Sequence, residues 1–311
     1  MNVKSYYRSA KLIRNYLGVS YTKLVRYYIL ERNGSFNVSI NGNKANLKFL
    51  DLQYIARLLE NGWKVIQSSG NLITFRSPDD ATITCRTNVM TDIFQLVEIF
   101  LEKPYGSDFN SMNVIDIGAS IGDSSIYFAK EGAKRVVGLE PDKRSFELAV
   151  KNVKASKVED HVSILNKALG DKGGETKLFV YDKSPNANSV DQSNMVRLKY
   201  TMHEETVESV PLKDVIGMFE GEQVHFLKMD CEGCEYSVLR YLDADSYKKI
   251  ENIVMEYHNG LQFLKDILES NGFTVVVKNS NDKMGYIKAK RYDCKTDNIL
   301  AKTSIHGNIK E

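Results

Sequence analysis

The sequence of 311 residues predicts an α/β fold, in which a largely parallel sheet is flanked by helices and preceded by a smaller α+β module. From about residue 114 onward, short β-branched runs alternate with helical patterns, as they do in parallel sheets. A glycine-rich turn over residues 118–122 follows the first of these runs directly. The start of the chain differs, because a basic, tyrosine-rich segment gives way to short alternating runs. We therefore expect an accessory module over residues 1–90 and a main domain over residues 91–311.

The main domain opens with strands and helices in alternation. Strands are expected over residues 113–118 and 134–140, and each is followed by a helix, over residues 124–133 and 141–156. In the second helix, apolar residues occupy the i, i+3, i+4 and i+7 positions of one face: Phe146, Ala149, Val150 and Val153. This pattern predicts a βαβα unit.

The rest of the main domain continues the same pattern. Further strands are expected over residues 161–169, 224–230, 251–257, 272–278 and 285–290, the last two as a terminal hairpin. The helix after the second of these strands should include Val238, Leu239 and Leu242. Gly173 and Gly174 predict a hairpin turn into one more strand.

The accessory module is expected to combine helices with short antiparallel strands. Residues 1–32 form a helical pattern in which bases alternate with tyrosines: Lys4, Arg8, Lys11, Arg14, Lys23 and Arg26, with Tyr6, Tyr7, Tyr16, Tyr21, Tyr27 and Tyr28. Strands are expected over residues 35–42, 71–77 and 81–87, around Asn/Gly and Pro-Asp turns. After the boundary, a helix is predicted that is capped by Thr91 or Asp92 and ended by Pro104.

Composition narrows the class of protein. The 42 Lys and Arg residues are offset by 40 Asp and Glu residues, a net charge of +2 that does not favour wrapping of nucleic acid. No apolar run approaches the roughly 18 residues of a membrane helix, and the start is interrupted by charges, unlike a signal peptide. The four cysteines are too few for a disulfide framework in so long a chain. We therefore expect a cytoplasmic protein in a reducing compartment.

The glycine-rich turn has the spacing of a cofactor site. Such a turn lets the backbone approach a nucleotide-like ligand, and the helix start offers N–H donors. Gly118 and Gly122, with Ser120 between them, depart from the G-x-G-x-x-G of nicotinamide-binding proteins. The spacing resembles the first motif of class I S-adenosylmethionine-dependent methyltransferases. Glu140 ends the next strand, where it could accept hydrogen bonds from both ribose hydroxyls. The alternatives are a glycine turn needed only for its backbone conformation and a surface acid.

A second acidic group follows a later strand, at the same predicted edge of the sheet. Asp230 and Glu232 end a buried strand, where open α/β sheets bind ligands. A carboxylate there could help an acceptor hydroxyl lose its proton during an in-line methyl transfer. His258 ends the following strand and could be the base, because histidine titrates near neutral pH. Alternatively, the two acids cap the next helix and His258 is a hydrogen-bonded histidine at a helix start. An inward Lys228 would indicate a cofactor or an acidic partner.

Several segments in order resemble the FkbM family of S-adenosylmethionine-dependent methyltransferases, which have a Rossmann-like class I sheet. The resemblance covers about two thirds of the chain. The family's D-x-G-A-x-x-G turn, E-P pair and K-x-D-x-E-G-x-E motif match these residues: Asp116, Gly118, Ala119 and Gly122; Glu140 and Pro141; Lys228, Asp230, Glu232, Gly233 and Glu235. Two departures stand out: Ser120 replaces a common Asn, and Cys231 and Cys234 replace apolar residues.

The resemblance implies O-methylation with S-adenosylmethionine as cofactor, commonly of a sugar hydroxyl in a glycan or a glycosylated small molecule. The cofactor-binding residues would be Asp116, Gly118, Ala119, Ser120, Gly122, Glu140, Pro141, Lys167, Ala168 and Asp230. Asp230, Glu232 and His258 would face the acceptor as catalytic residues. The rival hypotheses are methylation of a protein, RNA or another small molecule, and a non-catalytic partner in a glycan-modifying complex. RNA is disfavoured because no basic face accompanies the predicted core.

Four further features each have a structural and a functional interpretation. The Cys231-x-x-Cys234 pair invites a metal or redox interpretation, but zinc needs about four ligands, so packed thiols are expected. A divalent metal ion bridging Asp230 and Glu232 is not favoured, since no third ligand is evident. The N-terminal basic helix either packs on its module or contacts an anionic membrane or a lipid-linked glycan. The polar residues 184–194 are expected to form a loop that either covers the acceptor or is only a disordered surface loop.

Overall fold

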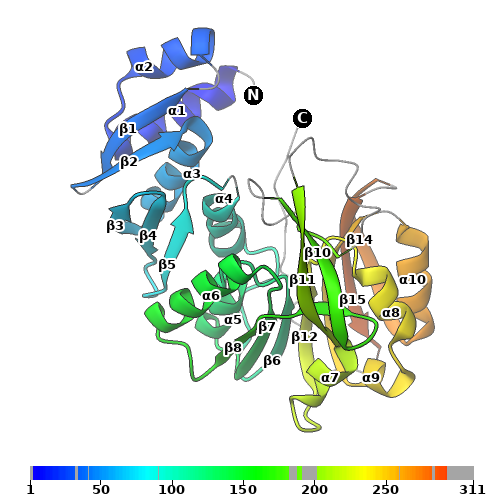
Figure 1. Cartoon of the computed structure of the whole chain (residues 1–311). Helices are drawn as coiled ribbons and strands as arrows, with labels where there is room; N and C mark the ends of the chain where they lie inside the picture. Colours follow the sequence, from blue (N-terminus) through cyan, green and yellow to red (C-terminus); the bar gives the residue numbers. More distant parts are fainter. Residues whose placement is uncertain are drawn as a thin grey trace. The chain divides into compact units, whose positions relative to one another are not determined.

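A seven-stranded mixed sheet forms the centre of the main domain (Figure 1). The computed structural model describes residues 3–31, 34–40, 42–89, 91–181, 188–190, 202–258, 260–281 and 284–292. Within this part of the chain, two compact units meet in the sequence at Pro104 and Tyr105, whereas the sequence predicted a boundary at residue 90. The predicted helix over residues 91–104 therefore packs with the first unit.

The order of the strands in the large sheet confirms the α/β fold class. From one edge to the other, the strands are β14 (Phe273–Asn281), β15 (Met284–Arg291), β13 (Ile250–His258), β12 (Val224–Met229), β6 (Asn113–Ile117), β7 (Arg135–Leu139) and β8 (Val162–Leu165). The five strands from β13 to β8 run parallel, and β15 runs antiparallel to both β13 and β14. The predicted terminal hairpin is thus confirmed. All five parallel strands end at the same edge of the sheet.

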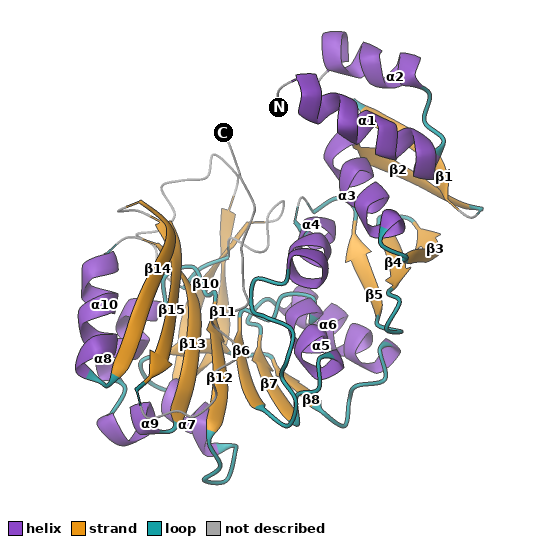
Figure 2. Cartoon of the chain, turned by 180° about the vertical axis from the view of Figure 1, so that it is seen from behind, coloured by secondary structure: helices purple, strands orange, loops and turns teal. Residues whose placement is uncertain are grey.

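Helices cover both faces of this sheet (Figure 2). They are α5 (Asp123–Lys130), α6 (Lys143–Ala155), α7 (Leu212–Gly217), α8 (Glu235–Tyr241), α9 (Ala244–Lys248) and α10 (Leu261–Ser270). Alternate residues of a strand point to opposite faces. Ile115 and Ile117 of β6 belong to the apolar cluster that includes residues of α8 and α10, while Asp116 between them is hydrogen-bonded to α5. Asp116 therefore lies on the α5 face of the sheet, two residues before the glycine-rich turn.

A separate three-stranded sheet corrects two of the predictions. It consists of β9 (Ala168–Gly170), β10 (Gly174–Tyr181) and β11 (Met202–Pro211), in the order β10, β11, β9. The predicted strand over residues 161–169 is therefore two strands, because the chain leaves the large sheet after Leu165. The predicted hairpin at Gly173 and Gly174 is also wrong, since β11 lies between β9 and β10. Local turn residues could not reveal a partner strand that comes so much later in the sequence.

The first unit is α+β, as predicted, but it contains more elements. They are α1 (Val3–Leu17), α2 (Tyr21–Arg26), a π-helical turn η1 (Tyr27–Glu31), β1 (Ser35–Ile40), β2 (Asn43–Lys48), α3 (Phe49–Glu60), β3 (Lys64–Ser69), β4 (Leu72–Arg76), β5 (Thr82–Arg86), α4 (Asp92–Leu96) and a π-helical turn η2 (Val97–Glu102). Of these, β2, α3 and β3 were not predicted. No helix in the described residues has the length and apolarity needed to cross a membrane.

The helix predicted over residues 91–104 is confirmed in part. It runs through α4 and η2 and ends where Lys103 adopts a left-handed conformation, φ 49°. Thr91 is the N-cap residue, but its side chain makes no capping hydrogen bond. The Asp92 carboxylate instead accepts a hydrogen bond from Arg86 Nε at 2.8 Å. Asp92 therefore ties α4 to β5, and it does not cap the helix.

Candidate active site

The structure brings most of the predicted site residues to one edge of the large sheet. Gly118 follows β6, Glu140 follows β7, Asp230 follows β12, and His258 is the last residue of β13. These four strands are parallel neighbours, so their carboxyl ends lie side by side. Open α/β sheets bind their ligands at this edge. We therefore treat this edge as the candidate active site.

The glycine turn, residues 118–122, is held by the backbone on both sides. Gly118 N and Ala119 N donate to Leu139 O at 3.0 and 2.9 Å, which fixes the turn to β7. Gly118 has φ 76°, and a Cβ atom there would lie 2.1 Å from Asp230 O. Only glycine fits such a position, because a side chain would collide with the backbone that follows β12. The turn thus links three strand ends.

The Glu140 carboxylate is hydrogen-bonded to the glycine turn. Its Oε2 accepts a hydrogen bond from Ser120 N, and its Oε1 accepts one from Asp142 N, both at 2.8 Å. The residue is only 7% exposed. Each carboxylate oxygen has two lone pairs, so these bonds orient the group without preventing it from accepting another from a ligand hydroxyl. Ser120 reaches this contact with φ 47°, an uncommon conformation for a residue with a side chain.

A buried ion pair lies beneath the glycine turn. Lys228 Nζ lies 3.0 Å from Asp116 Oδ1, and it also donates to Gly118 O at 3.0 Å and Ile117 O at 3.1 Å. Two hydroxyls of α5 donate to the other oxygen of Asp116, each at 2.6 Å: Ser124 Oγ and Ser125 Oγ. Burial lowers the pKa of Lys228, but the charges of Asp116 and Asp230 outweigh it, and the pKa is raised overall. The lysine therefore stays charged and fixes the turn from below, as its inward position suggested.

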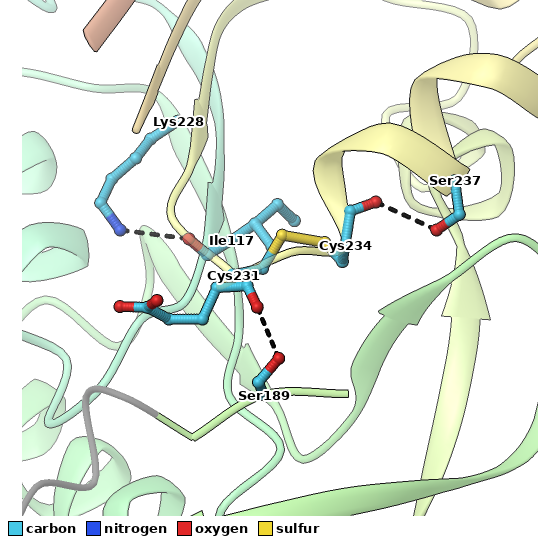
Figure 3. Close-up of a disulfide and its surroundings, with 7 residues drawn as sticks. Ile117, Ser189, Lys228, Cys231, Cys234 and Ser237 are labelled. Carbon is cyan, nitrogen blue, oxygen red and sulfur yellow. Dashed lines mark hydrogen bonds between the residues drawn. A yellow bond between two sulfur atoms is a disulfide. The ribbon is translucent and has the colours of Figure 1, made fainter. Parts of the chain in front are cut away.

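A second contact at this edge of the sheet joins Glu232 and His258. Glu232 Oε2 lies 3.1 Å from His258 Nε2, and the histidine is 4% exposed. The Ser189 hydroxyl donates to the Glu232 carbonyl (Figure 3). A carboxylate that contacts one ring nitrogen of a histidine can orient the ring and stabilise its charged form. Two of the three predicted catalytic residues are therefore in direct contact.

A disulfide bond closes the segment that carries Glu232. Cys231 and Cys234 are joined, three positions apart in the sequence (Figure 3). We had expected packed thiols, and this expectation is wrong for the structure described here. The connection between β12 and α8 is short enough to bring the two sulfur atoms together. We call residues 230–235 the disulfide loop.

Glu235, the last residue of the disulfide loop and the first residue of α8, is buried. Its carboxylate is fully buried, and neither oxygen forms a hydrogen bond within the described residues. Burial raises the pKa to about 7, and the charge of Asp230 adds to this rise. The nearby amides of Glu235, Cys231 and Gly233 lower the pKa, but their geometry falls short of hydrogen bonding. The loop thus encloses an acid that is partly protonated at neutral pH.

Two of the predicted cofactor-binding residues, Lys167 and Ala168, lie at the small three-stranded sheet. Lys167 Nζ contacts Glu208 Oε1 at 2.6 Å, and Ala168 is 2% exposed within β9. Their role in cofactor binding stays a prediction. The residue before them, Asn166, was missed: its Nδ2 donates to the carbonyls of Glu140 and Pro141 at 3.0 Å each. Asn166 therefore fixes the segment that carries the ribose-binding candidate.

Asp142 is a second residue that the sequence analysis missed. It caps α6 by accepting hydrogen bonds from Arg144 N at 2.8 Å and Ser145 N at 3.0 Å, and Asn188 Nδ2 donates to it at 3.0 Å. Burial raises the pKa of Asp142, but the bonds from the Arg144 side chain and the two amides lower it overall. An aspartate directly before a helix is a capping signal that could have identified it.

Two further expectations concern a loop over the acceptor and a metal ion. Of the predicted loop over residues 184–194, only residues 188–190 are described, so its role in covering an acceptor lies outside the structure. Within the described residues, no group of three or more His, Cys, Asp or Glu side chains could hold a metal ion.

Comparison with known proteins places this chain in a family. The family model "Methyltransferase FkbM domain" matches residues 116–275, about half of the chain. "Methyltransferase 1" of Beauveria bassiana (strain ARSEF 2860) is 29% identical over 200 residues, which are 58% of this chain and 80% of that protein. "Methyltransferase sdnD" of Sordaria araneosa is 24% identical over 211 residues, 58% of this chain and 82% of that protein. The solved structure of methyltransferase FkbM from Methylobacillus flagellatus KT has a TM-score of 0.41 and 16% identity, over 63% of this chain and 53% of that one. The chain belongs to the FkbM methyltransferase family.

Proposed function

We propose that this methyltransferase uses S-adenosylmethionine to methylate a hydroxyl group of a sugar, a glycan or a glycosylated small molecule. The observation that carries the proposal is the Glu140 carboxylate, held 2.8 Å from Ser120 N on the glycine turn. An acid in this place, at the end of the second strand, suits the two hydroxyls of a ribose. The cofactor would supply a methyl group activated by a positively charged sulfur.

The residues around the glycine turn fit such a cofactor. The left-handed conformations of Gly118 and Gly122 turn the backbone sharply between β6 and α5. Gly122 N donates to Ala119 O at 2.7 Å, so the turn is closed on itself. Asp116 and the lysine paired with it hold the turn from below. A turn that is fixed before the cofactor binds need not be ordered by it, which favours affinity.

The acceptor side fits an alcohol. A hydroxyl must lose its proton as the methyl group arrives, and a positioned base is worth about 10² to 10⁴ in rate. The Glu232 carboxylate, with a side chain that is 26% exposed, can take this proton, and the buried His258 imidazole, 3.1 Å from it, orients the carboxylate. Asp230 follows the adjoining strand and can accept a hydrogen bond from a neighbouring acceptor hydroxyl. Several hydrogen-bond acceptors at one edge favour a polyol such as a sugar.

The first unit offers a surface for an anionic acceptor or membrane, and we place the reaction in the cytoplasm. In α1, Tyr6, Ala10, Ile13 and Leu17 are buried. The bases of α1 and α2 are exposed: Lys4, Arg8, Lys11, Arg14, Lys23 and Arg26. No acid precedes Glu31 in the sequence. Cosedimentation with anionic vesicles but not with neutral ones would support a lipid-linked acceptor.

Calorimetry with S-adenosylmethionine tests the cofactor part of the proposal. We expect Glu140→Ala to weaken binding about 10- to 100-fold, because hydrogen bonds to a charged group contribute roughly 1.5 to 3 kcal/mol. The matched control is Glu147→Ala, an exposed acid on α6, which should bind as the wild type does. Failure of the wild-type protein to bind would contradict the proposal.

Release of S-adenosylhomocysteine tests the acceptor. The protein is incubated with S-adenosylmethionine and with sugars, glycosides, peptides or RNA in separate reactions. We expect turnover with hydroxyl-bearing glycosides, reduced about 100-fold or more in Glu232→Gln. Turnover with RNA or peptides alone would contradict the proposed sugar acceptor and would support one of the rival acceptors.

A further inference from the structure

We propose that Cys231 and Cys234 are a reversible thiol–disulfide site that controls the conformation of Glu232 and thereby the acceptor side of the active site. The disulfide is the only covalent link between side chains in the described residues. It lies within the family motif, because Asp230 directly precedes Cys231 and Glu235 directly follows Cys234. The consequence for the acceptor rests on the proposed function, whereas the redox site itself does not.

The disulfide holds an unusual backbone. It closes a loop of four residues, and the two residues inside it, Glu232 and Gly233, have φ angles of 54° and 119°. A left-handed conformation costs a glutamate free energy, so it persists only where the surroundings impose it. The bond between Cys231 and Cys234 is a constraint of this kind. Opening it removes one of the constraints that keep Glu232 in this conformation.

The bond can open without unfolding the domain. A disulfide that closes a short loop removes little entropy from the unfolded chain, so it contributes less to global stability than one that closes a long loop. Cys231 is half-buried, whereas Cys234 is 2% exposed and packs in the apolar cluster. A reductant therefore reaches the sulfur of Cys231 first. The sheet on which the loop is built is held by its own hydrogen bonds and apolar core.

Glu232 transmits the state of the disulfide to the acceptor side. Its carboxylate contacts His258 Nε2 at 3.1 Å, and its carbonyl accepts a hydrogen bond from the Ser189 hydroxyl. Figure 3 shows Ser189 beside the disulfide on one side and Lys228, which binds the Ile117 carbonyl, on the other. When the loop relaxes, the Glu232 carboxylate leaves His258. The glycine turn keeps its own hydrogen bonds to Leu139, so the cofactor side stays unchanged.

The chemistry needs a dithiol as reductant. One thiolate of the dithiol attacks Cys231 Sγ, the bond between the two sulfurs breaks, and Cys234 leaves as a thiolate that takes up a proton. The second thiol of the reductant then displaces Cys231 from the mixed disulfide. In total, the protein gains two electrons and two protons, and the dithiol becomes a disulfide. A cytoplasm with a reducing thiol pool would favour the open form, and oxidation would close it.

The test compares the oxidised and the dithiothreitol-reduced forms of the whole protein. Alkylation followed by peptide mapping should label Cys231 and Cys234 only in the reduced, still folded protein. Amide hydrogen exchange over residues 231–235 should be about tenfold faster after reduction, and exchange over residues 116–122 should change less than about twofold. The affinity for S-adenosylhomocysteine, measured by calorimetry, should also be the same in both forms within about twofold. With an acceptor in hand, its KM should rise about tenfold on reduction.

Two variants serve as controls. The double variant Cys231→Ser/Cys234→Ser should behave as the reduced protein and ignore the redox state. Cys85→Ala changes a buried cysteine of the first unit that is not part of this disulfide, and it should keep the full redox response. Labelling of Cys231 and Cys234 only in the unfolded protein would overturn the proposal, as would equal exchange rates in both forms. Absence of cofactor binding in both forms would instead overturn the proposed function, while labelling and exchange still decide the redox site.

Discussion

The glycine turn and the disulfide loop lie at the ends of neighbouring strands, yet they are built differently. Backbone hydrogen bonds to Leu139, a buried lysine and the Glu140 carboxylate hold the glycine turn. The disulfide loop contains a left-handed glutamate and a buried carboxylate, Glu235, that forms no hydrogen bond within the described residues. The glycine turn is thus held by several hydrogen bonds, whereas the disulfide loop contains a buried carboxylate that forms none within the described residues. Segments of the second kind open at lower free energy than the rest of a domain.

This contrast suits the two halves of a methyl transfer. A methyl donor that is always the same is best met by a rigid surface, because ordering the protein during binding weakens affinity. An acceptor must enter, react and leave, so its side of the site can open. We infer that the rigid glycine turn serves the methyl donor and that the adjustable disulfide loop serves the acceptor. The predictions below test each side of this contrast.

Gly118→Ala should have the largest effect. The new Cβ would lie 2.1 Å from Asp230 O, at φ 76°, so β6 and β12 must separate at the site. We expect a loss of roughly 5 kcal/mol in the free energy of unfolding, measured by urea denaturation, and no measurable cofactor binding. Gly217→Ala is the matched control, since a Cβ on this last residue of α7 meets nothing within 4 Å. It should be neutral or stabilise the protein slightly, and equal losses in both variants would contradict our account of the turn.

Lys228→Met should cause the second-largest loss in the free energy of unfolding. It leaves the carboxylate of Asp116, which is 0% exposed, without its cation, and removing one partner of a buried pair costs about 3 to 5 kcal/mol. Urea denaturation measures this loss. The double variant Lys228→Met/Asp116→Asn should recover part of it, because the uncompensated charge is gone. A double variant no more stable than Lys228→Met would show that the pair is not what holds the turn.

The sequence predicted the rigid half of this site better than the adjustable half. The strands before Gly118, Glu140 and Asp230 were visible because each is a short apolar run, and parallel strands end at one edge. The disulfide was not predictable, since the spacing of Cys231 and Cys234 is equally compatible with free thiols or a metal site. The pairing of β11 with β9 was also out of reach, because it joins segments far apart in the sequence. Local patterns identify elements, whereas these contacts depend on how the elements assemble.

Glu235→Gln tests the disulfide loop through pH. Burial raises the pKa of Glu235 from 4.5 to about 7, so the folded state binds this proton more tightly than the unfolded state does. Stability is therefore greatest below pH 4.5 for this group and is lost as pH rises through about 7, by up to about 3 kcal/mol. The variant carries no such charge, so it should be more stable than the wild type at pH 8 and lose this part of the pH dependence. Parallel stability profiles of the two proteins between pH 5 and pH 8, measured by urea denaturation, would contradict the prediction.

Lys167→Ala should have the smallest effect and mark where the cofactor side ends. The ion pair of Lys167 with Glu208 is partly exposed, with side-chain exposures of 32% and 61%, and such pairs contribute about 0 to 1 kcal/mol. Because the lysine points to β11, the variant should bind S-adenosylmethionine within about twofold of the wild type. Asn166→Ala is the informative partner, since it removes the two bonds to the carbonyls of Glu140 and Pro141 and should weaken binding several-fold. If calorimetry showed the reverse order, Lys167 would reach the cofactor as the sequence suggested, and the rigid surface would extend past β8 to the small sheet.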